Sequence, residues 1–171
     1  MKRTLSVLVE NRPGVLTHIS GLISRRGYNI ESIAASSTEL PDVTRISLVV
    51  EVVSTAQLEQ IVAQLEKLVQ VIKVIDMTNN ESLVRELALL KIKVEPALRQ
   101  EIINLTEIFR ARILDVHPET MVIEITGDGE KVTAFCKLME KYGIIEIIRT
   151  GEIFLTRDAE PAVKIRKESL R

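Results

Sequence analysis

Aromatic residues and cysteine are scarce in this sequence, and each shortage narrows what the chain can be. Phe, Tyr and Trp together make up 3% of the residues, so Leu, Ile and Val must form the core. Cys136 is the sole cysteine, which rules out an intramolecular disulfide and favours a reducing, cytoplasmic location. The two histidines and this cysteine share no regular spacing. We therefore expect no metal site and no catalytic nucleophile–base pair.

Neither sign of charge dominates, and long apolar runs are missing. The formal net charge is −1, with 8 basic and 8 acidic residues over 1–78 and 15 and 16 over the remainder. A nucleic-acid partner would require an excess of positive charge, so none is expected. No apolar run reaches the roughly 18 residues of a membrane-spanning helix, and the N-terminus does not resemble a signal peptide.

What the sequence does have is a repeated pattern of strands and helices. The pattern over residues 1–78 predicts the order βαββαβ, with strands over 5–9, 28–37, 45–53 and 71–77. The first helix is expected to start near residue 13, and the second is expected to be capped by Thr55. Residues 79–157 repeat that order, ending in one long strand or two short ones over 144–156. We therefore predict an α+β fold of two tandem ferredoxin-like βαββαβ domains, 1–78 and 79–157, joined by a linker near 78–82. A charged segment, 158–171, follows as a loose tail or a terminal helix.

Each predicted helix carries an apolar stripe that should face a sheet. The stripe of the first helix includes Leu16, that of the second extends to Val69, and that of the third includes Ile108. Cys136 falls on the stripe of the last helix, so we interpret it as an inert core residue.

The segment 9–16, Val-Glu-Asn-Arg-Pro-Gly-Val-Leu, joins the first strand to the first helix. Proline suits the first turn of a helix, so the helix is expected to begin near Pro13 or Gly14. Gly14 lets another molecule approach the backbone, next to N–H groups that carry partial positive charge. The turn then has two interpretations. It holds the carboxylate of a small amino acid, or it is an ordinary turn in which Asn11 closes a local hydrogen bond.

The second repeat has Val94-Glu95-Pro96-Ala97 in place of this turn, without the glycine and without an asparagine before the proline. Ligand binding is therefore expected in the first repeat alone, and the second is expected to contact a partner or to set the oligomeric state. One RNA-binding module shares the βαββαβ order but stacks bases on aromatics of its central strands, which are absent here.

At the level of families, residues 5–16 together with Arg-Arg-Gly-Tyr-Asn-Ile-Glu-Ser over 25–32 resemble the ACT domain of acetolactate synthase (acetohydroxyacid synthase) small subunits. Thr-Glu-Ile-Phe-Arg-Ala over 106–111, with Phe135, is similar to the C-terminal domain of the same family. The resemblance implies a non-catalytic chain that binds the large subunit, raises its activity and makes it sensitive to a branched-chain amino acid, usually valine. Thiamine diphosphate, Mg and FAD would belong to the large subunit, and this chain would carry no cofactor.

The resemblance also implies a homodimer in which two ACT domains lie side by side with the effector at their interface. The effector site would consist of Asn11, Pro13, Gly14, Val15 and Leu16 of one chain and Asn29 and Ile30 of the other. The small residues over 34–37 would let the two sheets approach. The alternative is a free-standing ACT-domain amino-acid sensor of another enzyme or a transcription factor, and a third reading is an independent enzyme of ferredoxin-like fold.

Overall fold

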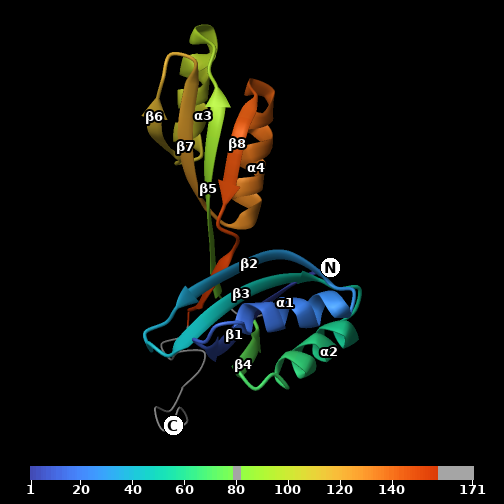
Figure 1. Ribbon diagram of the computed structural model, residues 1–171. Helices are drawn as coiled ribbons and strands as arrows, with labels where there is room; N and C mark the ends of the chain where they lie inside the picture. Colours follow the sequence, from blue (N-terminus) through green and yellow to red (C-terminus); the bar gives the residue numbers. More distant parts are fainter. Residues whose placement is uncertain (79–81, 158–171) are drawn as a thin grey trace. The chain divides into compact units, whose positions relative to one another are not determined.

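The computed structural model describes residues 1–78 and 82–157. The chain divides into two compact units: Met1–Leu83 together with residues 154–157, and Val84–Ile153 (Figure 1). This division differs from the sequence-based one at the C-terminal end of the second unit, where residues 154–157 join the first unit. Most of the predicted linker and the whole predicted tail, 158–171, lie outside the described residues.

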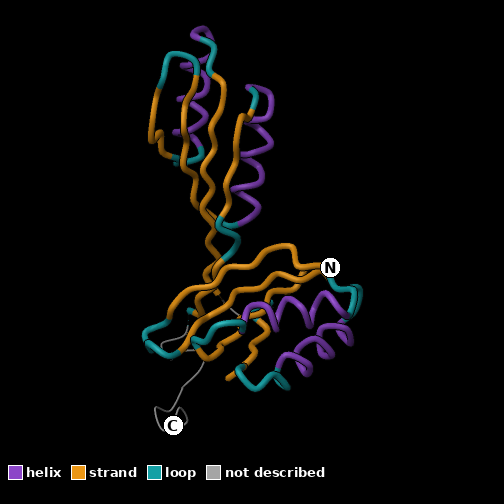
Figure 2. Tube along the Cα trace, viewed as in Figure 1, coloured by secondary structure: helices purple, strands orange, loops and turns teal. Residues whose placement is uncertain are grey.

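The first unit follows the order β1 (Lys2–Glu10), α1 (Val15–Arg25), β2 (Asn29–Ser37), β3 (Val43–Glu51), α2 (Thr55–Leu65) and β4 (Val71–Asp76). Its antiparallel sheet has the strand order β2-β3-β1-β4. Both helices cover the same face, α1 against β2 and α2 against β4 (Figure 2). Alternate residues of β1 and β3 face these helices, because successive side chains of a strand point to opposite faces. The core residues that the central strands contribute to this face are Leu5, Val7, Val9, Ile46, Leu48 and Val50.

Two expectations about the second helix are wrong. Ser54, and not Thr55, is its N-cap, and the Ser54 side chain accepts a hydrogen bond from the backbone N–H of Gln57 at 3.3 Å. The helix ends at Leu65, because the N–H groups of Lys67 and Leu68 bond to carbonyls three residues back and tighten the chain before β4. Val69 therefore lies beyond the helix and is 90% exposed.

The second unit contains β5 (Ser82–Lys93), a short 3₁₀ helix η1 (Pro96–Leu98), α3 (Arg99–Ile108), β6 (Arg112–Val116), β7 (Thr120–Gly127), α4 (Gly129–Met139), η2 (Glu140–Tyr142), β8 (Ile144–Arg149) and β9 (Ile153–Thr156). Its strand order, β6-β7-β5-β8, repeats that of the first unit position by position. The predicted α+β fold of two βαββαβ units is confirmed. The last predicted strand is two strands, separated at Gly151 with φ 76°, and β9 pairs with β5.

The core of the second unit is formed by α3 and α4 against β5 and β7. Phe135 is fully buried, and its ring lies 5.2 Å from that of Phe109 in a tilted arrangement. Ile108 was expected in this core but is 73% exposed. Thr106 faces inward instead and satisfies its hydroxyl by donating to the Ile102 carbonyl at 2.8 Å. Cys136 is half-buried at the edge of the core.

Candidate functional site

A glycine in the left-handed conformation forms the turn between β1 and α1. Gly14 has φ 85° and ψ −11° and is the N-cap of α1, so the helix begins at Val15. This φ strains any L side chain, whereas the space around Gly14 is open: a Cβ there would meet no atom within 4 Å. Pro13 lies outside the helix and does not occupy the first helical position for which proline was expected. The turn is thus shaped by backbone conformation and not by packing.

The first backbone N–H groups of α1 have no side-chain acceptor. No side chain caps this helix, and its first turn contains no acidic residue. In contrast, Ser54 caps α2, Asp128 caps α4 with a 2.8 Å bond to the Lys131 N–H, and α3 has Glu101 in its first turn. Among the α-helices of residues 1–78 and 82–157, α1 alone has neither a side-chain cap nor an acidic residue in its first turn. Its N-terminus therefore offers free donors and positive dipole charge to an external anion.

Asn11 holds this turn in place through a distant loop. Its backbone N–H donates to the Asp42 carbonyl at 2.8 Å, and its side-chain Nδ2 donates to the Pro41 carbonyl at 3.3 Å. Both acceptors lie in the connection between β2 and β3. The alternative in which the Asn11 side chain closes a local hydrogen bond is therefore wrong, because its amide bonds to Pro41 and joins two loops.

Two apolar side chains of this unit, on α1 and β2, are partly exposed and available for contact with another molecule. Leu16 was expected on the buried stripe of α1, but it is 46% exposed, whereas Val15 beside it is 5% exposed. Ile33 on β2 is 37% exposed although it lies opposite Leu48, which faces the helices. The sequence marked Ile33 only as an apolar strand residue, because its place on the edge strand depends on the sheet order.

The predicted effector residues do not all meet within one chain. Gly14 precedes the N-terminus of α1, whereas Asn29 and Ile30 open β2 beyond its C-terminus. The helix has 11 residues. At about 1.5 Å per residue, its ends are about 16 Å apart. Asn29 is exposed and Ile30 is half-buried against the core. Within one chain, these two residues therefore lie too far from Gly14 to contact the same small ligand.

Other chemistry has little support in the described parts of the chain. Among residues 1–78 and 82–157, no group of three His, Cys, Asp or Glu side chains is placed to hold a metal ion. Burial raises the pKa of the Cys136 thiol, which makes it a weaker nucleophile. His18 is exposed on α1, and His117 contacts Asp115 at 3.0 Å on the surface. No helix in the described ranges is long and apolar enough to span a membrane.

Two ferredoxin-like units in tandem, the first with an open helix N-terminus, are the arrangement expected of an ACT-domain protein. Comparison with known families agrees. Residues 5–73 match the AHAS small subunit-like ACT domain, and residues 85–158 match the family described as the small subunit of acetolactate synthase. The chain belongs to the family of acetolactate synthase small subunits, which are regulatory and non-catalytic.

Individual relatives cover almost the whole chain. A probable acetolactate synthase small subunit of Archaeoglobus fulgidus is 48% identical over 157 residues, which is 92% of this chain and 98% of the relative. The small subunit of Bacillus subtilis is 43% identical over 160 residues, covering 94% and 93%. The crystal structure of the Thermotoga maritima small subunit superposes with a TM-score of 0.84 at 39% identity, covering 92% and 98%. The resemblance drawn from the sequence is confirmed, and with it a regulatory role in branched-chain amino acid synthesis beside a large, catalytic subunit.

Proposed function

We propose that the first unit binds a branched-chain amino acid, with valine as the expected effector, and that binding confers feedback inhibition on the large subunit. The observation that carries this proposal is the open N-terminus of α1, which has free backbone donors, an exposed left-handed glycine and no acidic competitor. An α-carboxylate matches such a place in charge and in geometry.

The other groups of valine find partners of suitable chemistry. The backbone N–H groups around Gly14 and Val15 take the carboxylate, and amide oxygens of Asn11 and the partner's Asn29 accept from the ammonium. The isopropyl group rests on Leu16, which is 46% exposed, and on Ile30 and Ile33 of the second copy. One methylene more or less in such a pocket is worth only about 1–3 kcal/mol, so leucine and isoleucine act more weakly but are not excluded.

The second copy is needed because the two ends of α1 are too far apart for one chain to complete the site. β2 lies at the edge of its sheet, so its outer backbone groups are available to another chain. The second half of β2, Ala34-Ala35-Ser36-Ser37, consists of small residues, which would let a second sheet come close. We expect a homodimer formed through this edge, in which each chain contributes to both sites.

The remaining features of the proposal follow from the family. We expect this chain to carry no cofactor of its own, with thiamine diphosphate, Mg and FAD on the large subunit, and we expect both subunits in the cytoplasm. The alternative of a free-standing sensor is disfavoured because both units, and not the ACT domain alone, match small-subunit families. A pull-down from cell extract that recovers an acetolactate synthase large subunit supports the proposal, whereas recovery of a different enzyme or a transcription factor supports the sensor.

Isothermal titration of the full chain with valine, leucine and isoleucine tests the ligand. Valinamide is the matched control, because it keeps the ammonium and the isopropyl group but has no carboxylate. We expect valine to bind most tightly and valinamide to show no measurable heat. Equal affinity for valine and valinamide would contradict a site built on the helix N-terminus. Binding to a chain that stays monomeric at all concentrations would contradict the shared site.

A further inference from the structure

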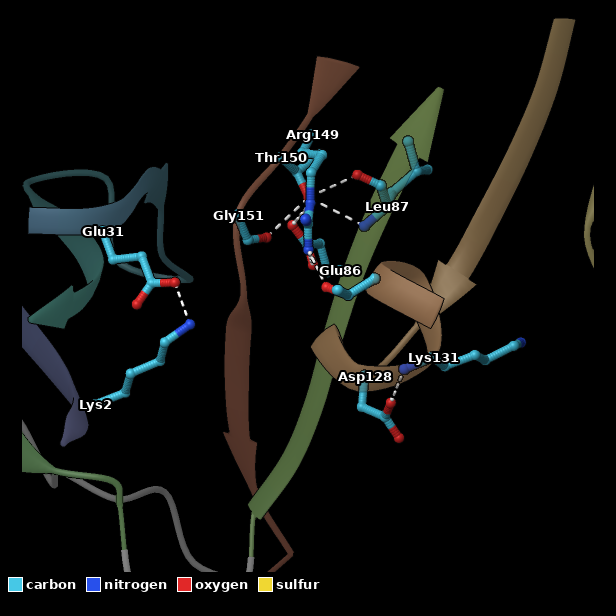
Figure 3. A network of polar contacts seen from close by, with 10 residues as sticks. Lys2, Glu31, Glu86, Leu87, Asp128, Lys131, Arg149, Thr150 and Gly151 are labelled. Carbon is cyan, nitrogen blue, oxygen red and sulfur yellow. Dashed lines mark hydrogen bonds and ion pairs between the residues drawn. The ribbon is translucent and has the colours of Figure 1, made fainter. Parts of the chain in front are cut away.

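Glu86 is a buried carboxylate at the end of the second unit's core. Its side chain is 4% exposed, and both of its oxygens are bound by one arginine. Arg149 donates from Nε to Oε1 at 2.8 Å and from Nη2 to Oε2 at 2.6 Å (Figure 3). The same Nη2 also donates to Thr133 Oγ1 at 3.3 Å. This paired geometry joins β5, β8 and α4 in a fixed orientation.

The residue after Arg149 is tied to the same unit by two hydrogen bonds. The backbone N–H of Thr150 donates to the Leu87 carbonyl at 3.0 Å, and its Oγ1 accepts from the Leu87 N–H at 3.1 Å (Figure 3). Gly151 turns the chain with φ 76°. The carboxylate of Glu152 lies so close to Gly129, the first residue of α4, that any Cβ there would collide with it. We call residues 149–152 the exit segment.

The exit segment lies where the chain leaves the second unit. The chain passes between the units twice, at Leu83–Val84 and at Ile153–Phe154, and the strands that carry these passages, β5 and β9, pair with each other. Glu86 is three residues past the first passage, and Arg149 is four residues before the second. The ion pair thus ties β5 to β8, close in sequence to both places where the chain passes from one unit to the other.

Stability alone does not account for this ion pair, in which the Glu86 side chain is buried and the Arg149 side chain is 38% exposed. Desolvation of the buried carboxylate offsets part of the attraction between the two charges, and apolar residues of similar volume often stabilise a fold as well or better. An arginine–carboxylate pair also fixes the relative orientation of the two side chains, because its two parallel hydrogen bonds require one geometry.

We propose that Glu86, Arg149 and the exit segment form a clamp that holds β5, the end of β8 and α4 in one fixed geometry within the second unit, next to the points where the chain leaves it. The clamp transmits an effector-dependent change of the first unit to the second instead of letting a flexible joint absorb it. Both clamp residues are positioning residues, and this inference rests on the proposed feedback function. Two sites are coupled when both shift the equilibrium of a structural element that lies between them.

The test uses the full chain reconstituted with its large subunit. The double variant Glu86→Leu with Arg149→Met replaces the ion pair by apolar side chains, and Arg149→Lys keeps a charge but loses the paired geometry. Lys141→Met is the matched control, because it removes an exposed ion pair with Glu101 in the same unit, away from the exit segment. For each variant we measure valine affinity by titration, stimulation of the large subunit without valine, and residual activity at saturating valine.

We expect the double variant to bind valine within about two-fold of the unaltered chain and to stimulate the large subunit. Its inhibition should fall by about five-fold or more, the lower end of typical allosteric coupling, while Lys141→Met is inhibited normally. Arg149→Lys should lie between the two. Full inhibition of the double variant at an unchanged valine concentration overturns the clamp, and so does an equal loss in Lys141→Met.

Hydrogen exchange separates this inference from the proposed function. The amides of Leu87 and Thr150 should exchange at least about ten-fold faster in Glu86→Gln than in the unaltered chain, because their hydrogen bonds open locally once the clamp is broken. Unchanged exchange overturns the clamp even if valine inhibits. Failure of the unaltered chain to bind valine overturns the proposed function, and the exchange result then decides on the clamp alone.

Discussion

Substitution of Gly14 by Asn and by Asp separates the charge of the proposed site from its backbone shape. The two side chains have the same size, and both tolerate a left-handed backbone better than other residues. Neither meets a steric obstacle, since the space around Gly14 is open. Any difference in ligand binding between the two variants therefore reports the added negative charge.

The expected magnitudes follow from the position at the N-cap of α1. A left-handed φ costs an ordinary L residue about 1–2 kcal/mol, and Asp and Asn part of that. A carboxylate at a helix N-terminus returns about 0.3–1 kcal/mol, so Gly14→Asp should be at least as stable as Gly14→Asn. Two like charges at ~4 Å repel by about 1 kcal/mol in water and about 4 kcal/mol near a protein surface. We therefore expect Gly14→Asp to bind valine at least about five-fold more weakly than Gly14→Asn.

The assay pairs urea unfolding with titration of valine for the unaltered chain, Gly14→Asn, Gly14→Asp and Gly14→Ala. We expect Gly14→Asp to have a free energy of unfolding at least as high as that of Gly14→Asn, but a much lower affinity for valine. In the reconstituted enzyme, Gly14→Asp should also abolish feedback while stimulation persists. Equal valine affinity for the Asp and Asn variants would refute the placement of the carboxylate at this helix N-terminus.

Three further outcomes test the second unit. Phe135→Ala should cost about 3–5 kcal/mol in urea unfolding, because the side chain is fully buried against Phe109. Burial raises the pKa of Cys136, so alkylation of the native chain at pH 8 should be slower than after denaturation, and equal rates would contradict its partial burial. Hydrogen bonds from Lys141 and Tyr142 lower the pKa of Glu101 from 4.5, so Glu101→Gln should be less stable than the unaltered chain at neutral pH. That difference should disappear as the pH falls through the lowered pKa, and a difference that persists in acid would contradict this ion pair.

The elements themselves were predictable because their patterns are local. The apolar and β-branched runs of β1 and β3 and the helical spacing in α1 depend only on neighbouring residues, and the ferredoxin-like fold followed from the repeated βαββαβ pattern. The ends of elements were not predictable to the same degree. Val69 and Ile108 fit the periodicity of their helices, but tightened turns end α2 before Val69, and the inward-facing Thr106 leaves Ile108 outside. The residue at which a helix ends depends on how the chain turns into the following strand.

The candidate site shows the same division between local and distant information. Gly14 could be identified from four consecutive residues, since a proline and a glycine after a strand predict a helix start. The loop partner of Asn11 lies 30 residues away, and the exposure of Ile33 depends on β2 being an edge strand. The ion pair of Glu86 with Arg149 spans 63 residues, and no spacing rule relates the two. These features arise only when strands distant in sequence become neighbours.

The two units share one topology, so the difference between their first helices explains why only one is expected to bind a ligand. In the second unit the corresponding turn continues into the 3₁₀ helix η1, and Glu101 supplies a negative charge in the first turn of α3. Arg99 at the start of α3 donates to the carbonyls of His117 and Pro118 at 3.1 and 2.8 Å, which fixes this end of the helix to the β6–β7 loop. An external carboxylate there would meet a like charge and a turn already held by its own contacts, whereas at α1 it meets free N–H groups. Duplicated backbones can therefore diverge in function through a few residues at one helix end, with the sheets unchanged.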